Sequence, residues 1–322
     1  MKTALTGVML ALGMTASLSG CGGSSGSGGG AVETGMLTDR VLPLQDLVRE
    51  YHLYVPAAYE GAPVVLLFHG HSRSHDDMIG RNGQISPYQK WFDIAARDNV
   101  IVVVPNGYNN GSEKGWNDCR NDAFGNSNAD DVAFMRALVD LVVDTYKADP
   151  NRVYATGTSN GGHFSIRLGL EMADKLTAFA AVAAANSVNT KCLPSSTPVS
   201  ALFMNGTGDP LLPYSGGQMT GNRGVVYSTA DTMSDWISRN GAETTAINSA
   251  FADINNADGS TVTRHEYPSG NNGTAVVLYR VLDGGHNEPS IETRLPSPIG
   301  NQNGDIEMAD EVWAFFVNKV RT

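Results

Sequence analysis

One stretch decides how this chain folds: Val153-Tyr-Ala-Thr-Gly-Thr-Ser159-Asn-Gly-Gly162. Residues 153–156 form a short, largely apolar run, which is typical of a strand buried on both faces. A helix is expected to start near Asn160, so Ser159 lies where the strand reverses into the helix. The glycines of the Gly-x-Ser-x-Gly motif relieve crowding at such a reversal. The stretch therefore predicts a Ser presented at the carboxyl end of a central strand.

Outward from this stretch, strand-like apolar runs alternate with amphipathic segments. The alternation predicts a mostly parallel sheet with helices on both faces, built as a single domain over residues 46–322. Strands are expected at 51–55, 63–68, 100–104, 153–156, 179–185, 199–204, 261–267 and 274–281, and helices at 88–97, 130–146, 160–173, 228–240 and 305–320.

Composition and charge narrow the class of function. The 322 residues are 41% hydrophobic and 17% charged, which is ordinary for a globular protein. The formal net charge of −11 argues against a nucleic-acid partner, because phosphates would be repelled. The same charge does not favour polyanionic substrates.

The first residues are typical of an export signal. Lys2 precedes an apolar stretch, Ala4–Met14, that is too short to span a bilayer comfortably. Leu18-Ser-Gly-Cys21 resembles a bacterial lipobox, in which the Cys is lipidated, and residues 22–30 are only Gly and Ser. We expect a signal peptide over 1–20, a tether and leader over 21–45, and a lipid anchor at Cys21 in the bacterial cell envelope. The alternative is an ordinary cleaved signal with an incidental Cys.

The three cysteines are also consistent with export to an oxidising compartment. With Cys21 assigned to the lipid, Cys119 and Cys192 remain, and in an oxidising compartment such a pair usually forms a disulfide. Two buried free thiols are the alternative. A metal site is not expected, because neither Cys lies in a C-x-x-C motif or a Cys/His cluster.

Asp209 and His286 follow Ser159 along the chain, which gives the order Ser, Asp, His that the α/β-hydrolase fold imposes. Asp209 lies just past one expected strand, and His286 follows a later one. We expect His286 to act as general base and then as acid, with Asp209 fixing its tautomer. Asp283 and Asp231 are rivals for the acid. Asp283 is too close in sequence to His286, and Asp231 lies in the first turn of a helix.

An oxyanion hole is expected from two backbone N–H groups, those of Asn160 and His71. His71 belongs to Phe68-His-Gly-His71, which ends the first buried strand. His69 and His71 could instead ligate a metal, but no third ligand stands in an obvious position. No metal is therefore expected.

Taken together, several motifs resemble the polyhydroxybutyrate depolymerase and feruloyl esterase group of extracellular esterases, from about residue 50 to the C-terminus. The resemblance implies a cofactor-free α/β-hydrolase that cleaves carboxylic esters through an acyl-enzyme. It also implies a disulfide that supports the site, Cys119–Cys192, and an aromatic wall near the Ser at Trp116, for which the alternative is that Trp116 is simply a core residue. The motifs are Phe68-His-Gly70, Gly115-Trp116, Asp131-Val132, Asp149-Pro-Asn-Arg-Val153, Gly157-x-Ser-x-Gly-Gly162, Asn205-Gly-Thr-x-Asp209 and Gly284-Gly-His286.

Two departures from the group's pattern fall where the substrate would lie, so they bear on which ester is cleaved. His71-Ser-Arg73 stands where the group commonly has Cys-x-Gly, and Glu288 stands two positions after the His where an aromatic residue is common. The ester substrate is expected to be short-acyl, aryl (feruloyl-type) or a polyhydroxyalkanoate-type polyester, rather than a long-chain lipid. The alternatives are a serine peptidase on the same fold and a non-catalytic surface lipoprotein that binds a ligand.

Overall fold

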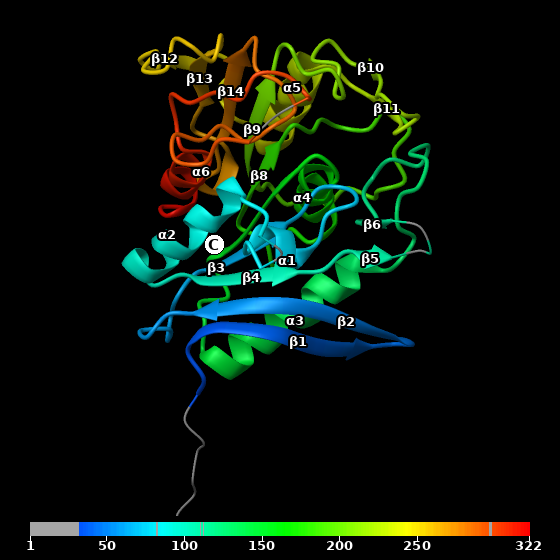
Figure 1. The fold of residues 1–322 in the computed structure, drawn as a ribbon, viewed down its shortest axis with the longest axis vertical. Coiled ribbons are helices and arrows are strands. Elements are labelled where there is room, and N and C mark those ends of the chain that lie inside the picture. Colours follow the sequence, from blue (N-terminus) through cyan, green and yellow to red (C-terminus); the bar gives the residue numbers. More distant parts are fainter. Residues whose placement is uncertain (1–31, 82, 110, 112, 296–297) are drawn as a thin grey trace, which may run out of the picture. The chain divides into compact units, whose positions relative to one another are not determined.

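Ten strands form one sheet at the centre of the computed structural model, which describes residues 32–322 except 82, 110, 112 and 296–297 (Figure 1). The strand order is β1-β2-β4-β3-β7-β8-β9-β14-β13-β12. The six central strands from β4 to β14 pair in parallel, and the two strands at each end pair antiparallel. The strands are β1 (Gly35–Leu44), β2 (Leu47–Val55), β3 (Val64–Phe68), β4 (Ile101–Pro105), β7 (Val153–Thr158), β8 (Ala178–Val182), β9 (Ser200–Gly206), β12 (Ile247–Ala250), β13 (Thr261–Tyr267) and β14 (Val276–Leu282).

The middle strands are buried along their whole length because helices cover both faces of the sheet. Alternate residues of β3 belong to two separate cores: Leu66 packs into one and Leu67 into the other. The first core lies under α3 (Asp131–Tyr146), α4 (Asn160–Glu171) and α5 (Thr229–Asn240). The second lies under α2 (Lys90–Asp98) and α6 (Met308–Phe316). This confirms the α/β class and the two helical layers predicted from the sequence.

Smaller elements complete the fold. A short turn, η2 (Asn271–Gly273), joins β13 to β14 as an antiparallel hairpin. The other short elements are α1 (His75–Met78), η1 (Pro87–Gln89), β5 (Tyr108–Asn109), β6 (Lys114–Gly115), β10 (Gly217–Gln218) and β11 (Val225–Val226). No helix in the described part of the chain has the length and apolarity that a bilayer crossing would require.

The folded unit starts earlier than expected. Residues Glu33–Thr322 form one compact unit, and β1 pairs with β2 as the edge strand of the sheet. Placing residues 21–45 in a tether and leader was therefore wrong for 35–44. The signal is weak because this edge strand is only half-buried, with Leu37, Leu42 and Leu44 packed on the first core. Cys21 and the expected signal peptide lie outside the described residues.

Candidate active site

Ser159 occupies the predicted reversal between β7 and α4. Its backbone has φ 58° and ψ −120°, a conformation that costs free energy for any residue with a Cβ. The surrounding structure holds it there, since the Ser159 N–H donates to the carbonyl of Val182 at 2.9 Å and the Ser159 carbonyl accepts from the His163 N–H at 2.9 Å. The side chain is therefore presented at the carboxyl edge of the sheet, above the start of a helix.

The two glycines of the motif are required by close backbone approach. A Cβ on Gly157 would lie 2.6 Å from the carbonyl carbon of Gly161, which is far inside van der Waals contact. A Cβ on Gly161 would overlap the carbonyl oxygen of Phe68 in the neighbouring strand. Any larger side chain at either position would force β7, β3 and α4 apart, so the turn can form only with glycine.

Asp209 lies in the loop after β9, and its side chain has no exposed surface. Its carboxylate is held at both oxygens. Oδ1 accepts from the N–H groups of Leu211 and Leu212 at 2.7 and 2.8 Å, and Oδ2 contacts Nδ1 of His286 at 2.7 Å. Because Oδ1 is already held by two backbone donors, Oδ2 is directed at the imidazole in one orientation.

His286 is placed by a loop that packs directly on the loop after β9. The N–H of Gly208 donates to the carbonyl of Gly284 at 2.9 Å, and the N–H of His286 donates to the carbonyl of Ile299 at 2.8 Å. A Cβ on Gly285 would overlap the Ile299 carbonyl oxygen. The glycines before His286 thus allow the close approach that the sequence predicted, and the His side chain is only 6% exposed.

The Asp209 contact decides the tautomer of His286. A carboxylate only accepts hydrogen bonds, so Nδ1 carries the proton and Nε2 is left with a lone pair. Of the rival acids, Asp231 is engaged elsewhere, because its Oδ2 accepts from the Ser228 hydroxyl at 2.6 Å at the start of α5. Among the described residues Asp283 makes no hydrogen bond or ion pair to His286, and its backbone N–H donates to Thr207 Oγ1 at 2.8 Å. Of the three candidate acids, the structure brings Asp209 to His286.

Ser159 and His286 line one cavity of about 740 Å³, a volume within the range of small-molecule sites. Part of its wall is apolar, formed by Ile85, Tyr88, Leu211, Met219, Leu295 and Ile299. The segments 210–227 and 287–304 both contribute to the wall, and Glu288 lies on it. The segment 83–88 was not predicted to take part, because a loop between α1 and α2 has no motif that shows where it packs.

The two expected oxyanion donors lie at this cavity. Asn160 is the first residue of α4, so its N–H has no carbonyl partner within the helix. His71 also lines the cavity, and a Cβ on the preceding Gly70 would lie 3.8 Å from Cβ of Ser159. The chain around residue 70 therefore runs beside the Ser, where a second N–H donor is needed.

The contacts of His69 bear on the alternative in which His69 and His71 ligate a metal. Nε2 of His69 accepts from the Gly107 N–H at 2.9 Å, so Nδ1 carries the proton and donates to the Gly70 carbonyl at 2.8 Å. Burial lowers the pKa of His69 to about 4, so the ring is neutral. With both ring nitrogens in use, His69 supports the backbone and cannot also bind a metal without losing a bond.

Asn160 also organises the site through its side chain, which sequence reasoning missed. Its Oδ1 accepts from the Trp116 N–H at 2.7 Å and its Nδ2 donates to the Trp116 carbonyl at 3.0 Å. Nδ2 also donates to Asp118 Oδ2 at 2.7 Å. The side chain thus pairs with a backbone segment as a strand would, and this fixes segment 116–118 against the start of α4.

Trp116 does not form the aromatic wall that the resemblance implied. The side chain has no exposed surface and does not line the cavity. Its ring stacks on Phe164 with centroids 5.1 Å apart, and its Nε1 donates to the His69 carbonyl at 2.9 Å. Trp116 is a core residue: these contacts hold its ring among core groups, while the Asn160 side chain fixes its backbone.

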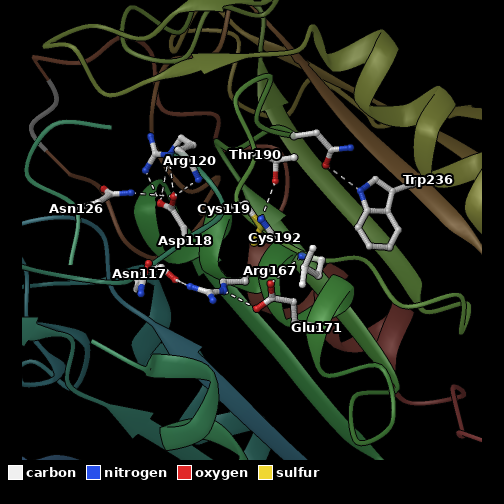
Figure 2. The surroundings of a disulfide bond; sticks show 12 residues. Asn117, Asp118, Cys119, Arg120, Asn126, Arg167, Glu171, Thr190, Cys192 and Trp236 are labelled. Atoms are coloured by element: carbon white, nitrogen blue, oxygen red, sulfur yellow. Dashed lines mark hydrogen bonds and ion pairs between the residues drawn. A yellow bond between two sulfur atoms is a disulfide. The ribbon is translucent and has the colours of Figure 1, made fainter. Parts of the chain in front are cut away.

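The disulfide predicted between Cys119 and Cys192 is present. Figure 2 shows it beside a buried ion pair, in which Nη2 of Arg120 lies 2.6 Å from Oδ2 of Asp118. Burial raises the pKa of Asp118, but the Arg120 guanidinium outweighs this and the pKa falls to about 2. Because Asp118 also bonds to Asn160, the disulfide, the ion pair and the helix that follows Ser159 form one connected support.

One group of possible metal ligands is present among the described residues: His52, His75 and Asp76. The two imidazoles are stacked, with centroids 3.9 Å apart and planes 6° apart, so their in-plane lone pairs run in parallel planes. His52 is already engaged by Asp76 at 2.9 Å and by the Asp39 N–H at 3.2 Å. Metal binding would require these rings to turn and these bonds to break.

The fold and the site together define the class. A mostly parallel sheet, a strand-Ser-helix reversal at its centre, and an Asp–His pair on two later strand ends make this protein an α/β-hydrolase. The chain belongs to an esterase family, since the family model described as "Putative esterase" matches residues 46–275. It is a carboxylic ester hydrolase.

Curated relatives agree with this assignment. Feruloyl esterase C from Emericella nidulans is 28% identical over 272 residues, which cover 84% of this chain and 84% of that protein. Feruloyl esterase D from Neurospora crassa is 27% identical, with 75% of this chain and 74% of that protein covered. Among solved structures, an acetyl xylan esterase from Aspergillus awamori matches with a TM-score of 0.52 and 15% identity, covering 84% of this chain and 94% of its own. This last match concerns the fold.

Proposed function

We propose that the chain hydrolyses esters through an acyl-enzyme, with Ser159 as nucleophile, His286 as general base and Asp209 as its orienting acid. One observation supports this above all: the Asp209–His286 contact leaves a basic Nε2 on a residue that shares the cavity with Ser159. A binding protein would have no need for this tautomer beside a strained Ser.

In this mechanism each group has a separate task. His286 Nε2 takes the Ser159 proton as Oγ attacks the ester carbonyl, and the backbone N–H groups of Asn160 and His71 stabilise the oxyanion. His286 then protonates the leaving alcohol. In the second half of the reaction His286 deprotonates a water molecule, which attacks the acyl-enzyme, and Ser159 leaves with the proton as the carboxylic acid is released. Asp209 holds the imidazole in place and stabilises its cationic form. No cofactor takes part in these steps.

The substrate that we propose is a short-acyl, aryl or hydroxyacid-type ester. The names of two relatives support the aryl option, since both are feruloyl esterases. The cavity supports it as well, because its apolar residues are interrupted by charged ones such as Glu288, which would disfavour a long alkyl chain. Buried Trp116 contributes nothing to this choice, contrary to the expectation.

We further propose that the protein is exported and carries a lipid on Cys21. The Cys119–Cys192 disulfide supports export, since such bonds persist in oxidising compartments. The Leu-Ser-Gly-Cys21 motif supports the lipid. Mass spectrometry of the mature N-terminus tests this, because the Cys21→Ser variant would lose the added acyl mass.

The test of the mechanism uses Ser159→Ala with Ser234→Ala, an exposed serine on α5, as the matched control. Ser159→Ala should lower kcat on p-nitrophenyl acetate by at least 10³-fold and abolish labelling by a fluorophosphonate probe, whereas the control should keep both. The same purified proteins are tried on methyl ferulate, acetylated xylan, polyhydroxybutyrate and peptide anilides. Faster cleavage of anilides than of esters would point to a peptidase, and retained activity in Ser159→Ala would refute the mechanism.

A further inference from the structure

Three arginines line the cavity that contains Ser159: Arg73, Arg120 and Arg223. Cationic side chains at a cavity bind anions only where their charge is not already neutralised by the protein. The three therefore have to be considered one by one, by the partners of each guanidinium.

Arg120 is neutralised. Its guanidinium forms the buried ion pair with Asp118 (Figure 2). It also donates to the Arg223 carbonyl at 2.8 Å. Only 2% of the residue is exposed. Its charge serves the internal support of the site, and it positions the backbone of Arg223.

Arg223 is half-buried and its partners are uncharged or weakly charged. Nη1 donates to the Phe124 carbonyl at 2.6 Å and lies 3.0 Å from Nε2 of His71, and Nη2 donates to Asn126 Oδ1 at 3.1 Å. Burial and the neighbouring Arg120 lower the pKa of Arg223, and the carboxylates of Asp118 and Glu113 offset this only in part.

No carboxylate forms an ion pair with Arg223 or Arg73 in the described part of the chain. The residues outside that part are 1–31, 82, 110, 112 and 296–297, and they include no Asp or Glu. Neither arginine therefore forms a direct ion pair within the described part of the chain. Outside the Arg120 pair, the acid that acts on Arg223 is Glu113, which contacts the same Nε2 of His71 and reaches Arg223 only through that ring.

Two acids also line the cavity, Asp77 and Glu288, and they have to be weighed against the arginines. Asp77 is engaged as the cap of α1, where its Oδ2 accepts from the Ser74 N–H at 2.8 Å. Glu288 lies on the segment after His286, whereas Arg223 bonds to His71 on the segment that ends β3. Glu288 and Arg223 form no ion pair in the described part of the chain, so a guanidinium without a directly bonded carboxylate stands at the cavity next to the proposed oxyanion donor.

Resting on the proposed function, we infer that the substrate carries a carboxylate in addition to its ester, and that Arg223, helped by Arg73, binds this carboxylate. A fork of N–H donors matches a planar carboxylate, and a partly desolvated guanidinium gains more from it than an exposed one. The net charge of −11 does not oppose this. At physiological ionic strength, charges farther than about 8 Å are largely screened, so local charges decide the binding of a small monoanion.

The carboxylate could belong to the acyl part or to the alcohol part of the ester, and paired substrates distinguish the two. Mono-(4-nitrophenyl) glutarate against 4-nitrophenyl pentanoate tests the acyl side. 4-Acetoxybenzoate against 4-acetoxybenzamide tests the alcohol side. The quantity measured is the ratio of kcat/KM for the anionic substrate to that for its neutral partner, so a uniform loss of activity cancels.

Arg223→Met should lower this ratio about tenfold or more on at least one pair, mainly through KM, and Arg223→Lys should restore part of it. The wild-type ratio should also fall between 50 and 500 mM NaCl. Arg136→Met is the control with the same charge change. Arg136 bonds to the Glu171 carbonyl at the far end of α4, which is about 18 Å from Ser159 at 1.5 Å per residue.

Two failures remain distinguishable. If the wild type cleaves the neutral esters but Arg223→Met leaves both ratios within twofold, or the control changes them as much, this inference is overturned and the proposed function stands. If the wild type cleaves no ester of either pair, the proposed function itself fails.

Discussion

Removing the disulfide through the double variant Cys119→Ala/Cys192→Ala should destabilise the domain by an amount that follows from its loop length. The cysteines are 73 residues apart. For a loop of this size the chain-entropy model gives about 4.4 kcal/mol at 25 °C, as lost entropy of the unfolded chain.

The native state should change little, which is why the unfolded-state figure applies. Backbone bonds hold the same two segments together without the sulfurs: Lys191 N–H donates to the Cys119 carbonyl at 3.0 Å, and Asn121 N–H donates to the Asn189 carbonyl at 2.9 Å. At about 2.1 cal/mol/K of unfolding entropy per residue, the compact unit Glu33–Thr322 should lose about 7 °C in Tm.

The assay is urea unfolding at 25 °C, followed by tryptophan fluorescence, together with a thermal scan. Wild type and double variant are each measured with and without a phosphine reductant. Reduction should bring the wild type down to the variant and should leave the variant unchanged. A loss below about 1 kcal/mol, or an equal effect of the reductant on both proteins, would refute the reasoning.

Two further predictions concern the acids of the site. Asp209→Asn should lower kcat by about 10³-fold or more, because the amide stabilises the wrong tautomer of His286, while Asp283→Asn should change kcat by no more than about threefold. Steady-state kinetics on p-nitrophenyl acetate compare the two variants. The reverse ranking would move the orienting acid to Asp283. Asp118→Asn should cost about 3 kcal/mol or more, because it leaves the buried Arg120 charge unpaired. The pKa of Asp118 is lowered in the folded state to about 2, so its contribution to stability is complete above about pH 4 and is lost as the pH falls towards 2. Urea midpoints from pH 5 to 2 check this, and the wild-type advantage over Asp118→Asn should shrink over that range; an advantage that stays constant would contradict it.

Much of the fold follows from local sequence. The apolar runs at 63–68, 100–104 and 153–156 can only be strands covered on both faces, and the Gly-x-Ser-x-Gly reversal can form only with glycine where backbones meet. The order Ser159, Asp209, His286 could be predicted because a parallel sheet brings the loops after its strands to one edge. The pairing of Cys119 with Cys192 followed from counting.

Other features were decided by the tertiary structure alone. The resemblance implied that Trp116 lines the substrate site, yet its ring is buried in the core, where it stacks on Phe164 and bonds to the His69 carbonyl. The edge strand β1 is hard to tell from a leader by sequence, because a half-buried strand next to a Gly/Ser segment has only a weak hydrophobic pattern. Whether the charge of Arg223 can bind an anion depends on the groups around it. Whether a cation is paired depends on atoms distant in sequence, and only packing brings those atoms together or keeps them apart.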